Sequence, residues 1–330
     1  MIETTNKHDG APQGPRPLAE ALEMTRALIQ QTLDGVDPAL TDIARHLGKS
    51  SGKHIRAALL LSAATDARGL IEPDAVTAAA ALEILHLATL VHDDVIDDAP
   101  TRRGLPSIQS QFGKKTAVIS GDYLFCLCFS MIAGMSHQYP EQISLFARAI
   151  SSLCIGELNQ HKHNRDSELS VMGYMRIIAG KTAALFFLAL YAGGLLGGAD
   201  EKQRRLLGRI GFAIGMLFQL ADDCLDYEST SDTLKKSVKH DLAEGVITLP
   251  LIFAMRQNPA LKTIAARSRL SAGEIRDVAE AVVQKGGLSQ ARTIAERYYH
   301  RACKLLDQLD EPVRQMQIRQ LLDQIHNRRH

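Results

Sequence analysis

The chain lacks the features that mark several large classes of protein. Its 330 residues carry a formal net charge of only +1, so there is no overall basic field for nucleic acid or an anionic membrane surface. No glycine-rich phosphate loop, internal repeat or alternation of strands with helices is present. The cysteines have no metal-finger spacing, and we expect them to be small core residues in a reducing compartment. They are Cys126, Cys128, Cys154, Cys224 and Cys303.

The N-terminal segment has no apolar signal sequence. Residues 1–16 are polar and rich in glycine and proline, which predicts a flexible arm. No apolar run approaches the roughly 18–20 residues of a membrane span without polar interruption. We therefore expect a cytoplasmic protein without a transmembrane segment, with one domain over residues 17–330.

The residues that are present favour helices. The chain is 45% hydrophobic and 23% charged, which is typical of a soluble globular protein. From Leu18 onward apolar residues recur at spacings of three and four, so the fold class predicted is all-α. Helices are predicted at 18–33, 38–47, 52–66, 74–97, 114–135, 140–161, 171–196, 201–227, 247–257, 271–285, 287–309 and 312–327. The four longest would form a single bundle around a deep apolar cavity.

Two aspartate clusters, each at the end of a long apolar helix, stand out. Carboxylates four residues apart share a helix face and repel one another, and a helix C-terminus further disfavours anions. A divalent cation would offset these costs, and clustered carboxylates suit Mg²⁺. The candidate ligands are Asp93, Asp94 and Asp97 in the first cluster, and Asp222, Asp223 and Asp226 in the second. A solvated acidic helix end, or carboxylates hydrogen-bonded without metal, remain the alternatives.

Basic and polar residues recur at the helix edges near these clusters. Taken singly, each is more often a solvated surface charge. Together with metal-binding carboxylates they suit a diphosphate, and an apolar shaft suits a long hydrocarbon. They are Lys53, Arg56, Arg102, Arg103, Lys181, Thr182, Gln219, Lys235, Lys236 and Lys239.

Three segments resemble the motifs of the trans-polyprenyl diphosphate synthases, in particular the long-chain octaprenyl type: LVHDDVIDDAPTRRG, GKTAALF and FQLADDCLDY. GKHIR, ALEILHLATL, SGDYL, GELNQ and DLAEGVITLP also match, in the family's order, over residues 50–255. The resemblance implies an all-α isoprenoid-synthase fold, a homodimer, and head-to-tail transfer of an allylic diphosphate onto isopentenyl diphosphate. It implies Mg²⁺ held by both aspartate motifs, roughly three ions per site.

The resemblance also assigns roles by position. Asp93, Asp97 and Asp222 would bind metal, supported by Asp94, Asp223 and Asp226. The allylic diphosphate would be held by Arg102, Lys181 and Lys236, and isopentenyl diphosphate by Lys53, Arg56, His86 and Arg103. Thr182 and Gln219 would face the allylic cation, and we expect His92 to be a supporting hydrogen-bonder. The family usually has a lysine where this chain has Val246, which predicts weaker allylic binding.

Product length in this family depends on bulk below the first aspartate motif. Ala88 and Thr89 lie about one turn before Asp93, and small residues there would leave the shaft open. Phe125 and Phe129 are candidates for a deeper floor. We therefore expect a long, octaprenyl-like product of the kind used as a quinone side chain. The alternatives are a short-chain farnesyl or geranylgeranyl diphosphate synthase, a non-catalytic partner subunit, and a terpene cyclase, which would lack the second aspartate motif.

Overall fold

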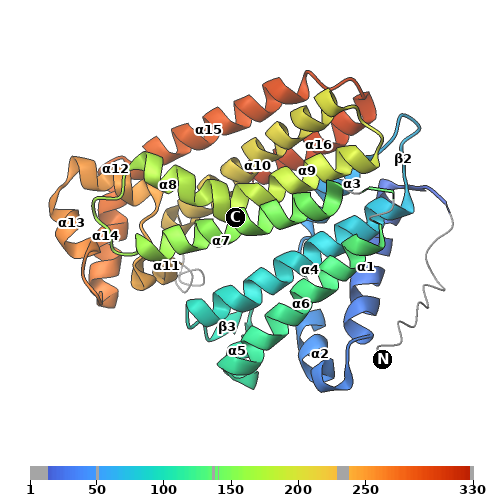
Figure 1. Cartoon of the computed structure of the whole chain (residues 1–330). Coiled ribbons are helices and arrows are strands. Elements are labelled where there is room, and N and C mark those ends of the chain that lie inside the picture. Colours follow the sequence, from blue (N-terminus) through green and yellow to red (C-terminus); the bar gives the residue numbers. More distant parts are fainter. Residues whose placement is uncertain (1–13, 50–51, 136–137, 140, 229–237, 328–330) are drawn as a thin grey trace. The chain divides into compact units, whose positions relative to one another are not determined.

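The computed structural model describes residues 14–49, 52–135, 138–139, 141–228 and 238–327 (Figure 1). Most of these residues lie in helices, which confirms the predicted all-α class. Within the described ranges the strands are two short antiparallel pairs. β1 (Arg16–Pro17) pairs with β2 (Leu70–Ile71), and β3 (Thr101–Arg102) pairs with β4 (Leu105–Pro106).

The chain divides into two compact units. The first contains the described residues up to position 140, together with Ala192–Asp200 and Glu311–Arg314. The second contains Glu141–Tyr191, Glu201–Asp310 and the described residues from Gln315 onward. The single domain expected from the sequence stays a prediction.

The first unit is built around α4 (Pro73–Ile96), which carries the first aspartate cluster at its end. α4 packs along α6 (Lys114–Gly134) and against α1 (Leu18–Asp34) and α3 (Ile55–Ala64) (Figure 1). Nine α4 residues are completely buried, and their small or aliphatic side chains let neighbouring helices pack closely: Ala75, Ala78, Ala79, Ala80, Ala81, Leu82, Ile84, Leu85 and Ala88. The smaller elements are η1 (Pro38–Leu40), α2 (Thr41–Lys49) and α5 (Ile108–Phe112).

The second unit is built around α10 (Glu201–Glu228), which carries the second aspartate cluster. α10 packs along α15 (Gly287–Leu306), and α15 also packs against α12 (Leu249–Gln257). The helices before α10 are α7 (Glu141–Lys162), α8 (Val171–Ile178), the π-helical turn η2 (Ala179–Ala183) and α9 (Ala184–Leu196), whose last turn belongs to the first unit. The others are α11 (Val238–Glu244), α13 (Ala260–Ala265), α14 (Ala272–Gln284) and α16 (Pro312–His326), which begins in the first unit.

The predicted helices are all present, with ends shifted by a few residues. The helix predicted from residue 52 begins at Ile55, because His54 adopts a left-handed conformation with φ of 46°. The helix predicted over 171–196 is interrupted by η2. The short helices α5, α11 and α13 were not predicted, because five to seven residues are too few to show a helical period.

Three described helical stretches are long and apolar enough to cross a membrane by length and composition alone. They are Pro73–Ile96, Lys114–Gly134 and Val171–Leu196. The most apolar window of the first and third is 67% buried within the protein, against 33% for the second. The expected absence of a membrane span stays a prediction, and the apolar residues of α6 require a different explanation from those of α4.

Candidate active site

The first aspartate cluster closes α4. The Asp97 backbone N–H donates a hydrogen bond to the Asp93 carbonyl at 2.8 Å, so these residues lie one turn apart on the same side. Both side chains are half-buried, whereas Asp94 is buried. Arg102 compensates the buried charge, because its Nε donates to Asp94 Oδ1 at 2.8 Å. Asp94 is therefore a partner of Arg102, and Asp93 and Asp97 have the more accessible carboxylates.

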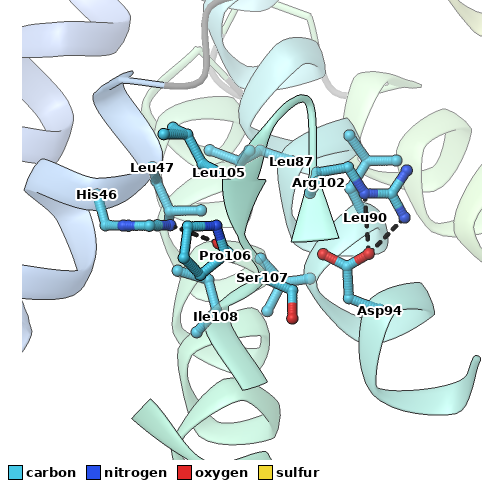
Figure 2. A pocket seen from close by; sticks show the side chains of 11 residues that line it. His46, Leu47, Leu87, Leu90, Asp94, Arg102, Leu105, Pro106, Ser107 and Ile108 are labelled. Atoms are coloured by element: carbon cyan, nitrogen blue, oxygen red, sulfur yellow. Dashed lines mark hydrogen bonds and ion pairs between the residues drawn. The ribbon is translucent and has the colours of Figure 1, made fainter. Parts of the chain in front are cut away.

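A tight turn fixes the two arginines that follow. Strands β3 and β4 pair Arg102 with Leu105, and the intervening Arg103 and Gly104 have φ values of 51° and 81°. Positive φ at both central residues is the signature of a type I′ hairpin, in which glycine is strongly preferred. Figure 2 shows Arg102 reaching from this hairpin to Asp94. The Arg-Arg-Gly motif is thus a turn that determines where its arginines point.

The hairpin is also held from α2. The Nε2 of His46 donates a hydrogen bond to the carbonyl of Pro106 at 2.8 Å (Figure 2). The pocket drawn there is lined mostly by aliphatic side chains and holds about 30 Å³, room for a water or two. It is a packing gap and is too small for a diphosphate.

Positive charge gathers around His86 in the first unit. Burial lowers the pKa of His86 well below its usual value, and the nearby charges of Arg56, Arg103, Arg102 and His54 lower it further. His86 is therefore neutral at physiological pH. The arginines come from α3 and from the β3–β4 hairpin, so several of them can bind the same anion.

The start of α3 is fixed by Glu83 of α4. Its Oε1 accepts a hydrogen bond from the Ala57 backbone N–H at 3.0 Å, and His54 Nδ1 lies 3.3 Å from its Oε2. An acidic side chain at this helix N-terminus also interacts favourably with the positive end of the helix dipole. Glu83 thereby orients the turn that carries Arg56, which is half-buried, and Lys53, which is exposed.

The second aspartate cluster places carboxylates at three depths on α10. Asp222 is exposed, Asp226 is half-buried and Asp223 is buried. Burial raises the pKa of Asp226 to about 9, and the carboxylates of Asp241, Asp222 and Asp223 contribute to that shift. Burial likewise raises the pKa of Asp223 to about 7. Four acidic groups are crowded here, and a divalent cation would relieve their repulsion.

A chain of hydrogen bonds links this cluster to the residues predicted to face the allylic cation. Thr182 Oγ1 donates to Gln219 Oε1 at 2.6 Å, and Gln219 Nε2 donates to Asp223 Oδ1 at 2.7 Å. The Tyr174 hydroxyl donates to the other oxygen of Asp223. Tyr174 was missed by the sequence analysis. A tyrosine in the apolar stretch just before Lys181 was the available signal, because a buried tyrosine hydroxyl needs a partner.

Lys181 and Thr182 lie in η2 rather than in a regular helix. A Cβ added to Gly180 would lie 2.6 Å from the carbonyl oxygen of Ser152 on α7. A Cβ added to Gly156 would lie 2.3 Å from the backbone nitrogen of Lys181. The backbones of α7 and η2 therefore touch, and π-helical turns of this kind are frequent at functional sites.

Glu157 completes this contact and was also missed as a site residue, although it belongs to the GELNQ motif. Lys181 Nζ donates a hydrogen bond to Glu157 Oε2 at 2.9 Å. The lysine and glutamate side chains are 24% and 18% exposed, so the pair is only partly solvated. Glu157 explains how a lysine is accommodated in an otherwise apolar helical stretch.

The residues predicted to control product length belong to the α4–α6 pair. Ala88 is completely buried. Thr89 is also buried, and its hydroxyl donates a hydrogen bond to the His86 carbonyl at 2.8 Å. Phe125 and Phe129 are half-buried on α6. Their role in setting product length stays a prediction.

Three of the lysines considered in the sequence lie outside the described residues. They are Lys235, Lys236 and, for its side chain alone, Lys239. The prediction that the cysteines are core residues is wrong for Cys126 on α6 and Cys154 on α7, which are exposed.

His92 forms a hydrogen bond to α6, and its expected support of the aspartates stays a prediction. Its Nε2 donates to the Val118 carbonyl at 3.1 Å. Its ring occupies the space that a Cβ at Gly121 would need, because that Cβ would lie 2.2 Å from Nε2 of His92. Gly121 is therefore required for the contact between α4 and α6.

Within the described ranges no three acidic, histidine or cysteine groups are gathered as a ready-made metal cage. This fits Mg²⁺, which usually binds through one or two carboxylates together with waters and substrate phosphates. The crowded acids around Asp226 are suitable hard oxygen donors for such an ion. The candidate holders are Asp93, Asp97 and Asp222, which are half-buried or exposed.

Comparison with known proteins identifies the family. Residues 37–284 match the family model described as polyprenyl synthetase. The chain belongs to the polyprenyl synthetase family. It is a prenyltransferase that acts in prenyl chain elongation.

Among curated relatives, this polyprenyl synthetase is 32% identical over 297 residues to heptaprenyl diphosphate synthase component 2 of Bacillus subtilis, covering 88% of this chain and 83% of that protein. A polyprenyl synthase structure from Caulobacter crescentus, complexed with calcium and isoprenyl diphosphate, matches with a TM-score of 0.87 and 28% identity, covering 97% and 100% of the two chains. A geranylgeranyl pyrophosphate synthase from Lactobacillus brevis matches with a TM-score of 0.83 and 33% identity, covering 94% and 97%. The likeness therefore extends to producers of both long and short chains.

Proposed function

We propose that this polyprenyl synthetase condenses isopentenyl diphosphate with an allylic diphosphate to give a long all-trans polyprenyl diphosphate, octaprenyl-like in length. The observation that carries the proposal is the hydrogen-bonded chain from Thr182 through Gln219 to Asp223. It joins the second aspartate cluster to the turn that presents Lys181, so groups for metal, diphosphate and cation lie in one network.

The proposed roles follow from charge and position. Bound Mg²⁺ would neutralise the charge that develops on the departing diphosphate. Arg102 and Lys181, with Lys236, would bind that diphosphate by charge-assisted hydrogen bonds. The hydroxyl of Thr182 and the amide of Gln219 would turn their dipoles toward the allylic carbon as it becomes positive.

The cations around His86 would hold the second substrate. Arg56 and Arg103, with Lys53, would bind the diphosphate of isopentenyl diphosphate, while neutral His86 would contribute a ring N–H. These groups belong to the first unit, and Lys181, Thr182 and Gln219 belong to the second. We propose that both aspartate clusters contribute carboxylates to the metal ions.

Self-association is supported by exposed apolar residues on α6 of the first unit and on α7 of the second unit. Val118 and Ile119 on α6 are 40% and 54% exposed, and Ile155 and Leu158 on α7 are 59% and 69% exposed. Each of the two units therefore has large exposed apolar side chains, which mark interaction surfaces. We propose that a second copy of this chain covers them in a cytoplasmic homodimer.

A second candidate is a subunit of a heteromeric synthase. It is favoured by the likeness to a protein named as component 2 of a heptaprenyl diphosphate synthase. In that case the same apolar faces of α6 and α7 would meet a different chain, and the purified protein alone would be inactive.

Binding of Mg²⁺ and inorganic diphosphate tests the proposed site. We expect the two together to raise the unfolding temperature of the protein, and Asp222→Asn to reduce that rise, because ligands that bind only the folded state stabilise it. No rise in the unfolding temperature would favour carboxylates that serve only as internal hydrogen-bond acceptors.

A further inference from the structure

Arg165 lies in the loop between α7 and α8 and has an unusual backbone conformation. Its φ is 62°, a region that residues with a Cβ rarely adopt. Arg165 belongs to none of the sequence motifs. Such a conformation persists only where surrounding contacts hold it in place, so the contacts of Arg165 are informative.

The contacts are numerous and all lead to backbone carbonyls. The guanidinium donates from Nη1 to the carbonyl of Glu244 at 2.9 Å and from Nη2 to that of Ala243 at 3.1 Å. Its Nε donates to the carbonyl of Arg267 at 3.1 Å, and its backbone N–H donates to that of Gly245 at 2.7 Å. A cation is favoured here, because Ala243 and Glu244 end α11 and helix C-termini carry negative partial charge.

Gly245 allows the Arg165 side chain to lie close to the backbone at the end of α11. A Cβ at that position would lie 2.5 Å from Cγ of Arg165, and Gly245 itself has a φ of 81°. The two residues therefore form a matched pair, in which the missing side chain of one makes room for the side chain of the other. Together they fix the turn in which α11 ends.

The same short helix carries Asp241. The carboxyl of Asp241 lies near the second aspartate cluster, because α11 packs against α10 and the Asp241 carboxylate helps to raise the pKa of Asp226. The backbone N–H of Val246, just beyond the turn, donates to the Asp241 carbonyl at 2.8 Å. A shift of the turn would therefore move Asp241 relative to the carboxylates proposed to hold metal.

We propose that Arg165 is a positioning residue, which holds the end of α11 and thereby sets Asp241 beside the second aspartate cluster for binding of the metal–diphosphate. It acts through backbone carbonyls and does not touch substrate. This inference rests on the proposed function and adds to it a residue that no motif includes.

Two variants of the full chain separate the effect of the Arg165 guanidinium hydrogen bonds from the effect of its backbone conformation. Arg165→Asn keeps a residue that tolerates positive φ but removes the guanidinium. Arg165→Lys keeps the charge but cannot reach three carbonyls with one planar group. Arg267→Ala is the matched control, because it removes a guanidinium paired with Glu274 and keeps the carbonyl that Arg165 uses.

We expect both Arg165 variants to raise the allylic KM and the half-saturating Mg²⁺ concentration by about tenfold, since several hydrogen bonds from a charged group are lost. The KM for isopentenyl diphosphate should change less than about twofold, because its proposed cations lie in the first unit. Backbone amides of Arg165 and Val246 should exchange hydrogen faster in both variants. Arg267→Ala should leave all of these quantities near the wild-type values.

Unchanged amide exchange in Arg165→Asn and Arg165→Lys would show that the guanidinium does not hold the end of α11. Faster exchange with an unchanged allylic KM and Mg²⁺ dependence would overturn the positioning role. If the wild-type protein elongates no primer, the proposed function fails by itself. The inference would then be decided by amide exchange and by the thermal shift with Mg²⁺ and inorganic diphosphate, where an equal shift in variant and wild type would contradict it.

Discussion

Lys181 and Glu157 form a hydrogen-bonded ion pair, with 2.9 Å between Nζ and Oε2, at the place where α7 meets the π-helical turn η2. The pair restricts the lysine side chain, because its Nζ is held by the Glu157 carboxylate. A lysine placed in advance by a neighbouring carboxylate loses less conformational freedom when an anion binds.

The first prediction concerns this pair. Lys181→Ala should lower kcat/KM for the allylic substrate by about 100-fold, because a charge that stabilises the leaving diphosphate is removed. Glu157→Gln should have a smaller effect, about tenfold or less, since the amide oxygen still accepts the hydrogen bond. Steady-state kinetics with varied allylic substrate would measure both. Equal losses in the two variants would contradict separate roles for them.

The second prediction concerns the close contact between α7 and η2. Gly180→Ala should lower the free energy of unfolding by about 1–3 kcal/mol, because the new methyl group would press on the Ser152 carbonyl. Gly134→Ala is the matched control, since its Cβ would meet nothing within 4 Å. It should be neutral or stabilising by up to about 1 kcal/mol. Urea unfolding would compare them, and a Gly180→Ala protein as stable as wild type would show that the contact is not tight.

The third prediction concerns pH. Burial raises the pKa of Glu83, but hydrogen bonds from His54 and Ala57 and the charge of Arg56 outweigh it, so the pKa is lowered from 4.5 in the folded state. A carboxyl with a lowered folded pKa stabilises the fold above its unfolded pKa, and that stabilisation is lost as pH falls through the folded pKa. Glu83→Gln should therefore cost on the order of 1–3 kcal/mol at pH 6. The difference from wild type should narrow below pH 4.5, and a gap that widens there would contradict the assignment.

The fourth prediction concerns product length. Ala88→Phe should shorten the product, because a bulky ring would enter the apolar shaft that we expect below the first aspartate cluster. Ala272→Phe, on an exposed face of α14, should leave product length unchanged. Chromatography of dephosphorylated products would give the lengths. Products of wild-type length from a folded Ala88→Phe protein would contradict the open shaft.

The fifth prediction concerns the lysine that the family usually has at position 246. Val246→Lys should lower the allylic KM by up to about tenfold, since one further charged donor would reach the diphosphate. Val246→Met, which changes shape without charge, should not. An allylic KM that is the same in all three proteins would show that the missing lysine has no cost here.

The sequence predicted the helices better than it predicted the local geometry of the candidate site. Long periodic runs such as 74–97 and 201–227 identify their helices, whereas the cation site indicated by repeated aspartates four residues apart stays a prediction. The π-helical turn at Lys181 could not be predicted, because it arises from contact between Gly180 and α7, far apart in sequence. Tyr174 and Arg165 were missed for the same reason, since their partners Asp223 and Glu244 are 49 and 79 residues away.

The most direct test of the account is the length of the product. Purified protein would be incubated with Mg²⁺, labelled isopentenyl diphosphate and farnesyl diphosphate, and the dephosphorylated products would be separated by size. We predict a ladder that ends in a long polyprenol, which requires the proposed chemistry and an open shaft below Ala88. No incorporation of label with any allylic primer would contradict the proposed activity of this chain by itself and would turn attention to a missing partner subunit.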